Sequence, residues 1–96
     1  MSFTQTHEME GTLHECLRGL ISALGHRDFE VTGDKVIVRD QDKRFVISLI
    51  YEGNRHLGSL DLPMTRVEYE CTGCTEAEAK EFHDNIAKHL MRIGGG

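Results

Sequence analysis

The residues with the clearest capacity for chemistry are Cys71 and Cys74, which form a C-x-x-C motif in the stretch YECTGCTEAE. Two thiols at this spacing can cycle between dithiol and disulfide, and a helix that begins just after them can lower a thiol pKa by stabilising the thiolate. The same sulfurs can supply half of a tetrahedral zinc site. A third interpretation is structural, because small cysteine side chains also suit a crowded turn.

The neighbours of the two cysteines favour the structural interpretation. Cys71 shares strand parity with Val67 and Tyr69, which predicts an inward-facing side chain. Cys74 directly precedes a predicted helix cap at Thr75, so we expect it to face the turn. Nearby acidic side chains raise a thiol pKa and oppose activation; here they are Glu70, Glu76 and Glu78. We expect two thiols that need not act together, with redox or zinc chemistry as the alternative.

A complete zinc site would need two more ligands. His14 and Cys16 are two positions apart in a predicted helix, which turns their side chains about 200° away from each other. A ligand from His83 or His89 would require a tertiary contact that the sequence does not predict. The chain has three cysteines, and an odd number cannot all pair internally. The first eleven residues also lack the basic start and apolar stretch of a secretory signal. We therefore expect reduced thiols and a cytoplasmic location.

The six histidines match no known catalytic pattern. His83 and His89 border the apolar stripe of a predicted C-terminal helix, where histidines are more often hydrogen-bonded boundary residues than catalysts. The residue four positions after His14 is Arg18, so the His-Glu-x-x-His motif of zinc proteases is absent, as is the Gly-x-Ser-x-Gly nucleophile elbow. We expect a non-enzymatic protein without a cofactor, and zinc is the only alternative.

Charge and hydropathy narrow the possible partners. The net charge is −5, from 16 acidic and 11 basic side chains, and the basic residues are scattered beside acidic ones. A nucleic-acid-binding domain normally concentrates its Lys and Arg on one face, so such a partner is disfavoured. No apolar run approaches the roughly 20 residues that span a bilayer, so we expect no membrane-spanning segment.

Two amphipathic helices are predicted, one near each end of the chain. Thr12 with Glu15 and Thr75 with Glu78 both have the spacing of a capping box, in which each side chain bonds to the other residue's amide. Gly25 is placed to end the first helix. Apolar residues then recur at helical spacing; they are Leu13, Cys16, Leu17, Leu20, Ile21 and Leu24 in the first helix, and Ala79, Phe82, Ile86, Leu90 and Ile93 in the second.

Between the helices the apolar period changes to two, which predicts four or five antiparallel strands. Turns are expected at Gly33-Asp34, at 40–43 and at 52–55, and RFVISLIY (44–51) is the most apolar strand. Pro63 marks an edge, a bulge or a bend. The prediction is one α+β domain over residues 1–96, in the order α-β-β-β-β-α. Residues 1–11 are expected to be flexible, loose or only partly helical. Both helices should cover the face with Phe45, Ile47, Leu49 and Tyr51.

The opposite sheet face gives the leading hypothesis about function. Strand parity predicts that it carries a mixed set of apolar and charged side chains, and exposed apolar patches often mark interaction surfaces. We expect a small non-enzymatic binding or assembly module that forms a homodimer or docks a protein partner there. The alternative for this face is that loops or residues 1–11 cover it. The predicted contact residues are Ile37, Val46, Ser48, Ile50, Arg66 and Glu68.

Overall fold

Seven elements follow one another along the chain in the computed structural model, which describes the backbone of residues 2–94 and the side chains of residues 3–90. Met1 and residues 95–96 lie outside the described part. The elements are β1 (Ser2–Glu10), α1 (Leu13–Leu24), β2 (Asp28–Thr32), β3 (Lys35–Asp40), β4 (Lys43–Leu57), β5 (Leu60–Thr72) and α2 (Glu76–Gly94).

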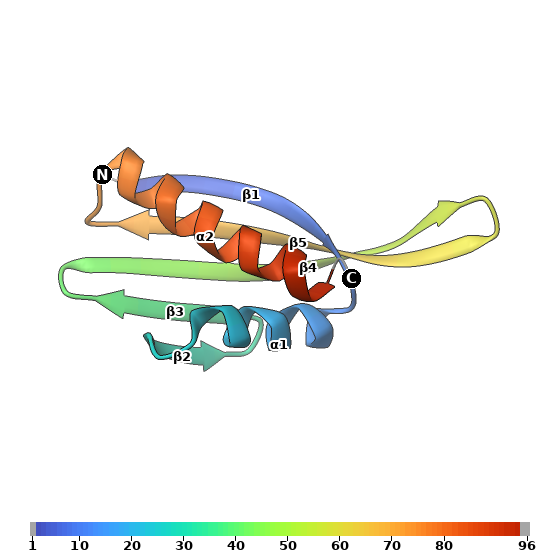
Figure 1. The fold of residues 1–96 in the computed structure, drawn as a ribbon, viewed down its shortest axis with the longest axis horizontal. Coiled ribbons are helices and arrows are strands. Elements are labelled where there is room, and N and C mark those ends of the chain that lie inside the picture. The colour runs from blue at the N-terminus through green and yellow to red at the C-terminus, as the bar shows by residue number, and fades with distance from the viewer. Residues whose placement is uncertain (1, 95–96) are drawn as a thin grey trace.

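The strands form one sheet in the order β1-β5-β4-β3-β2, and every neighbouring pair is antiparallel. Both helices pack on the same face of this sheet, with α2 crossing it diagonally and α1 beside β2 and β3 (Figure 1). The predicted α+β class, with a helix on either side of the strand run, is confirmed. Tight turns between consecutive strands from β2 to β5 explain the antiparallel pairing, because parallel neighbours need long crossovers.

The caps and the core agree with the predicted apolar stripes. Glu15 N donates to Thr12 Oγ1 at 3.2 Å and Thr12 N donates to Glu15 Oε1 at 3.0 Å, so the first capping box is complete. One cluster of buried side chains joins both helices to the sheet, and Phe45 stacks on Phe82 with ring centroids 3.9 Å apart. The stripe residues Leu20, Leu24, Ile86 and Leu90 are all at most 3% exposed. Ile93 lies outside the described side chains.

The N-terminal segment differs from the prediction. Residues 2–10 form the strand β1, which pairs with β5 from Ser2↔Thr72 to Glu10↔Met64, so the expectation of a loose or partly helical segment was wrong. The physical reason is tertiary. β5 would otherwise present an unpaired edge, and β1 satisfies its backbone groups. Phe3, Gln5, His7 and Met9 share one face of β1 and are half-buried, while the residues that alternate with them are exposed.

The segment EGNR (52–55) is not a turn, contrary to the prediction. β4 continues through it to Leu57, and the register shifts between Tyr51 and Gly53, which marks a β-bulge. Gly53 has φ of 90°, which suits a bulge as well as a turn. The hairpin reverses instead at Gly58 and Ser59.

The extra length of β4 and β5 forms a two-stranded projection, residues 53–64, which we call the arm. It extends well beyond the helices in Figure 1, and the molecule measures 47 × 24 × 23 Å. Pro63 lies within a continuous β5, at the point where its pairing with β1 ends. Tyr51, at the base of the arm, is 46% exposed rather than covered as predicted.

Neither helix, over the residues that the structure describes, combines enough length with enough apolarity to cross a membrane.

Candidate functional site

The open face of the sheet, opposite the helices, brings together all six residues predicted as a binding surface. They form three adjacent cross-strand pairs on β3, β4 and β5, and all six are half-buried. β1 does not fold across this face but pairs at the sheet's edge, so the N-terminal residues do not cover it. The pairs are Ile37 with Val46, Ser48 with Glu68, and Ile50 with Arg66.

Charges divide the open face into two flanks around the aliphatic centre formed by Ile37, Val46 and Ile50. On β3 and β4 the charged residues are Lys35, Arg39 and Arg44, and β5 on the other side carries Arg66, Glu68 and Glu70. Asp28 and Glu30 of β2 lie beyond β3 on the same face. Arg39 and Arg44 lie directly opposite each other, and like charges in that relation destabilise a sheet.

Ion pairs within the face neutralise some of these charges but not all. Arg39 pairs with Glu30 at 3.5 Å, and Arg66 pairs with Glu68 at 3.7 Å and with Glu52 at 3.5 Å. These side chains are about one-third to three-fifths exposed, so solvent screens each pair strongly. Within the described side chains, Lys35, Arg44 and Glu70 form no ion pair, and their charges are available to a partner.

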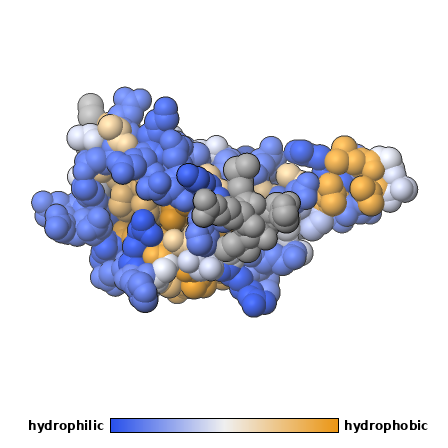
Figure 2. Space-filling model, viewed as in Figure 1, coloured by the Kyte–Doolittle hydropathy of each residue, from blue (hydrophilic) through white to orange (hydrophobic). Residues whose placement is uncertain are grey.

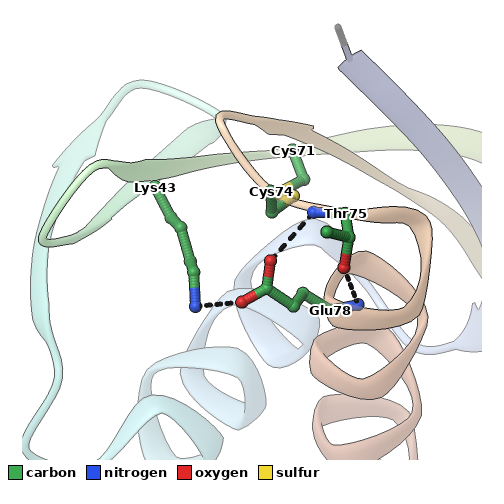
Figure 3. Close-up of a disulfide and its surroundings, with 5 residues drawn as sticks. All are labelled: Lys43, Cys71, Cys74, Thr75 and Glu78. Carbon is green, nitrogen blue, oxygen red and sulfur yellow. Dashed lines mark hydrogen bonds and ion pairs between the residues drawn. A yellow bond between two sulfur atoms is a disulfide. The ribbon is translucent and has the colours of Figure 1, made fainter.

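Cys71 and Cys74 are joined as a disulfide, with Cα atoms 6.4 Å apart (Figure 3). The expectation of two reduced thiols that need not act together was therefore wrong. Cys71 is buried as predicted, at 2% exposure, but Cys74 also packs against the core. The turn explains this. Gly73 has φ of 83°, and a Cβ there would clash with the carbonyl oxygen of Asp42, so only glycine fits.

The start of α2 fixes this turn against the neighbouring hairpin. Glu78 closes the second predicted capping box, because Thr75 N donates to Glu78 Oε1 at 2.9 Å and Glu78 N donates to Thr75 Oγ1 at 3.2 Å. The second carboxylate oxygen forms an ion pair with Lys43 at the start of β4 (Figure 3). The hydrogen bond from Lys43, then that from the Thr75 amide, lowers the pKa of Glu78.

The described residues near the disulfide provide no further metal ligands. Within the described residues, no group of three or more His, Cys, Asp or Glu side chains is placed to hold a metal ion, so the zinc alternative finds no additional ligands at Cys71 and Cys74. The third cysteine, Cys16, is buried at the other end of the core. Burial raises the pKa of its thiol, which makes it a poor nucleophile.

A hollow of about 510 Å³ opens near the disulfide, between α2, the β3–β4 turn and the start of β2. The stacked rings of Phe45 and Phe82 line it, and the Arg27 guanidinium lies 5.7 Å from the Phe82 ring centroid. Lys43, Glu78 and Glu81 contribute a rim of mixed charge. The hollow can accept an apolar group, but no nucleophile with an adjacent base lines it.

Sequence reasoning missed a cluster of histidines between β1 and α2. His7 Nδ1 lies 3.3 Å from His83 Nε2, and His83 Nδ1 lies 3.2 Å from Asp84 Oδ1. The ring of Tyr69 packs against both, with centroids 5.3 Å from His7 and 4.9 Å from His83. Burial, then the charge of His83, lowers the pKa of His7 to about 4. Burial also raises the pKa of Tyr69.

The signal for this cluster was present but faint. His83 was recognised as a residue at the border of the apolar stripe, which is where it lies. His7 alternates in register with Phe3 and Met9, the two apolar members of β1. Because residues 1–11 were not predicted to form a strand, nothing placed His7 against α2.

Comparison with known proteins adds no family or relative: no protein-family model matches the chain, and no curated protein matches it. The fold and the geometry of its residues are what support a function.

Proposed function

We propose that this protein is a small non-enzymatic assembly module that forms a symmetric homodimer through the open face of its sheet. The observation that supports it most directly is the aliphatic centre of Ile37, Val46 and Ile50 on a face that no other described element covers. Two such sheets can pack face to face at about 10 Å, as in a β-sandwich.

Charge complementarity is the reason to propose a second copy rather than another partner. A two-fold axis parallel to the strands and close to β4 places the β5 flank of one copy over the β3 flank of the other. Glu70 of one copy then faces the 35–39 stretch of the second, which includes Lys35 and Arg39. The aliphatic side chains of Val46 and Ile50 meet their counterparts at the centre. Each contact occurs twice, as an isologous interface requires.

The open face is slightly smaller than one side of a standard interface. Five strands at about 4.8 Å spacing and nine residues at about 3.3 Å rise give a face of up to about 700 Å². A standard interface buries about 800 Å² per partner, so the whole face would have to take part. The acidic side chains on β5 would repel phosphate groups, which disfavours nucleic acid as a partner. We also propose that the protein is cytoplasmic.

The test is the oligomeric state of the purified protein, measured by sedimentation equilibrium over a range of concentrations. The chain mass is 10.9 kDa, and we expect a dimer whose dissociation constant rises at least about tenfold in Val46→Asp, a change of about 1.4 kcal/mol. Leu57→Asp, at the tip of the arm, is the matched control and should leave the dimer intact. Circular dichroism checks that both variants fold.

Charge-reversal variants test the two-fold arrangement itself. Glu70→Lys alone and Lys35→Glu alone should each weaken the dimer, because each places like charges across the interface. The double variant restores both contacts and should recover most of the affinity. A wild-type monomer at every concentration, or a dimer unaffected by Val46→Asp, would remove the basis of the proposal.

Thiol-redox activity is the second candidate, favoured by the Cys71–Cys74 disulfide and by a hollow that can accept an apolar group, which is lined by Phe45, the cross-strand partner of Cys71. In this function a substrate dithiol would reduce the disulfide and become oxidised itself. Thiol titration of the folded protein against a dithiol reductant tests it. A disulfide that resists reduction until the chain unfolds would be structural, and the redox candidate would fail.

A further inference from the structure

The pair formed by His7 and His83 lies on the helix side of the sheet and takes no part in the proposed dimer interface. It joins the N-terminal strand to the C-terminal helix across 76 positions of sequence. The His83 side chain is 16% exposed and that of Asp84 is 58% exposed, so the pair lies near the surface rather than deep in the core. Water and small ions therefore have access to it.

The spacing of the two ring nitrogens matches a metal site. Two nitrogen ligands at 2.0–2.1 Å from a tetrahedral zinc ion are separated by about 3.3–3.4 Å. His7 Nδ1 and His83 Nε2 are 3.3 Å apart. We propose that these two nitrogens bind a divalent transition-metal ion of the zinc class.

Asp84 provides the outer support that such a site needs. Metal-binding histidines usually donate their second ring N–H to a carboxylate, which fixes the tautomer and the ring orientation. His83 Nδ1 lies 3.2 Å from Asp84 Oδ1, so the proton is held on Nδ1 and the lone pair of Nε2 points toward His7. Asp84 is thus a positioning residue, not a ligand.

The protons balance without a further group. In the metal-free pair one ring donates to the other, so His7 carries its proton on Nδ1 and donates to His83 Nε2. Metal binding requires the lone pair of His7 Nδ1, and the proton moves to Nε2 of the same ring. No third His, Cys, Asp or Glu joins the pair among the described side chains, so water fills the remaining coordination positions. Two protein ligands predict a modest affinity.

The experiment is titration of the metal-free protein with Zn²⁺ by calorimetry, supported by the visible spectrum of a Co²⁺ complex. We expect one ion per chain, with affinity reduced at least about tenfold by His7→Gln or His83→Gln and by about tenfold in Asp84→Asn. His56→Gln, in the exposed arm, is the control and should bind as the wild type does. The titration is repeated in a Cys71→Ser/Cys74→Ser background, where binding should persist.

Wild-type protein gives a second readout if a variant fails to fold. The ring resonances of His7 and His83 should respond first to added Zn²⁺ in NMR spectra, before those of His14, His26 and His56. The proposal is overturned if Zn²⁺ does not bind, if binding is unchanged in both histidine variants, or if it disappears with the cysteines instead.

Discussion

The hairpin of β4 and β5 has two halves that have the same strand pairing but different surroundings. In the body, β3 and β1 flank the two strands and the helices cover them, and Ile47, Leu49 and Val67 are at most 1% exposed. In the arm, beyond the pair of Met64 with Glu10 at its base, each strand has only the other as neighbour, and Leu57 and Leu60 are 53% and 60% exposed. Figure 2 shows an apolar patch toward the far end of the projection. The comparison therefore separates what burial contributes to the free energy of unfolding from what strand pairing contributes.

The contacts that hold the arm are local and exposed to water. Tyr51 donates to Asn54 Oδ1 at 2.6 Å, His56 contacts Asp61, and Arg55 lies 3.6 Å from Glu8. Contacts of this kind stabilise by at most about 1 kcal/mol each. Because a two-stranded hairpin alone is marginal in water, the arm should open locally while the body remains folded.

The largest expected difference between the halves is the cost of removing an aliphatic side chain. Ile47→Ala leaves a cavity in the fully buried centre and should reduce the free energy of unfolding by about 2–5 kcal/mol. Leu57→Ala in the arm should change it by no more than about 0.5 kcal/mol. Urea denaturation followed by circular dichroism measures both. Equal losses would mean that the arm is packed against something in solution, a second copy included.

The glycine turns at the ends of the two halves give an intermediate effect. Gly73 and Gly58 both have positive φ, 83° and 64°, so alanine is strained at either position by about 1–2 kcal/mol. A Cβ at Gly73 would also clash with the backbone of Asp42, whereas nothing lies within 4 Å of one at Gly58. Gly73→Ala should therefore destabilise the chain more than Gly58→Ala in the same urea experiment.

Local opening of the arm could hide part of the effect of Gly58→Ala on urea denaturation. Amide hydrogen exchange resolves this, because Gly58→Ala should speed exchange only within residues 53–64, while Gly73→Ala should speed it in the body. Equal losses of unfolding free energy would contradict the role assigned to the close approach of Gly73 and Asp42.

Local chemistry allowed the sequence to predict the helices and the open face, but not the strand ends. Thr12 with Glu15 and Thr75 with Glu78 fix both helix starts through neighbours in sequence. Parity places Val46 on the face opposite Ile47, and that rule holds for every regular strand. Such features depend on residues a few positions apart.

The features that were missed depend on distant partners. β1 has only two apolar inward residues, Phe3 and Met9, and its strand form comes from the unpaired edge of β5. Gly53 suits a turn or a bulge, and the pairing between β4 and β5 decides between them. The Cys71–Cys74 disulfide depends on the conformation of Gly73, which the close approach of Asp42 helps to fix. The histidine pair was missed because His7 lies in β1, which was not predicted, although His83 lies in α2, which was.

The smallest expected effect is the pH dependence of the ion pair that ties β4 to α2. The pKa of Glu78 is lowered below its ordinary value of 4.5 by Lys43 and the Thr75 amide. The folded state therefore favours the carboxylate, and its stabilising contribution is present above pH 4.5 and is lost as the pH falls through the lowered pKa. Glu78→Gln should accordingly be less stable than wild type at pH 7, and the gap should narrow by pH 3.

The arm provides the matched control for this measurement. Asp61→Asn removes the carboxylate that contacts His56, at a site where no helix or core residue depends on the contact. The urea midpoints of both variants and wild type are measured at pH 7 and pH 3. The difference in midpoint between Asp61→Asn and wild type should stay within error at both pH values. A Glu78→Gln gap that is equally large at both pH values would show that the carboxylate charge is not what stabilises this junction. No gap at either pH would show that the Glu78 side chain acts through shape and hydrogen bonding alone, because glutamine preserves both.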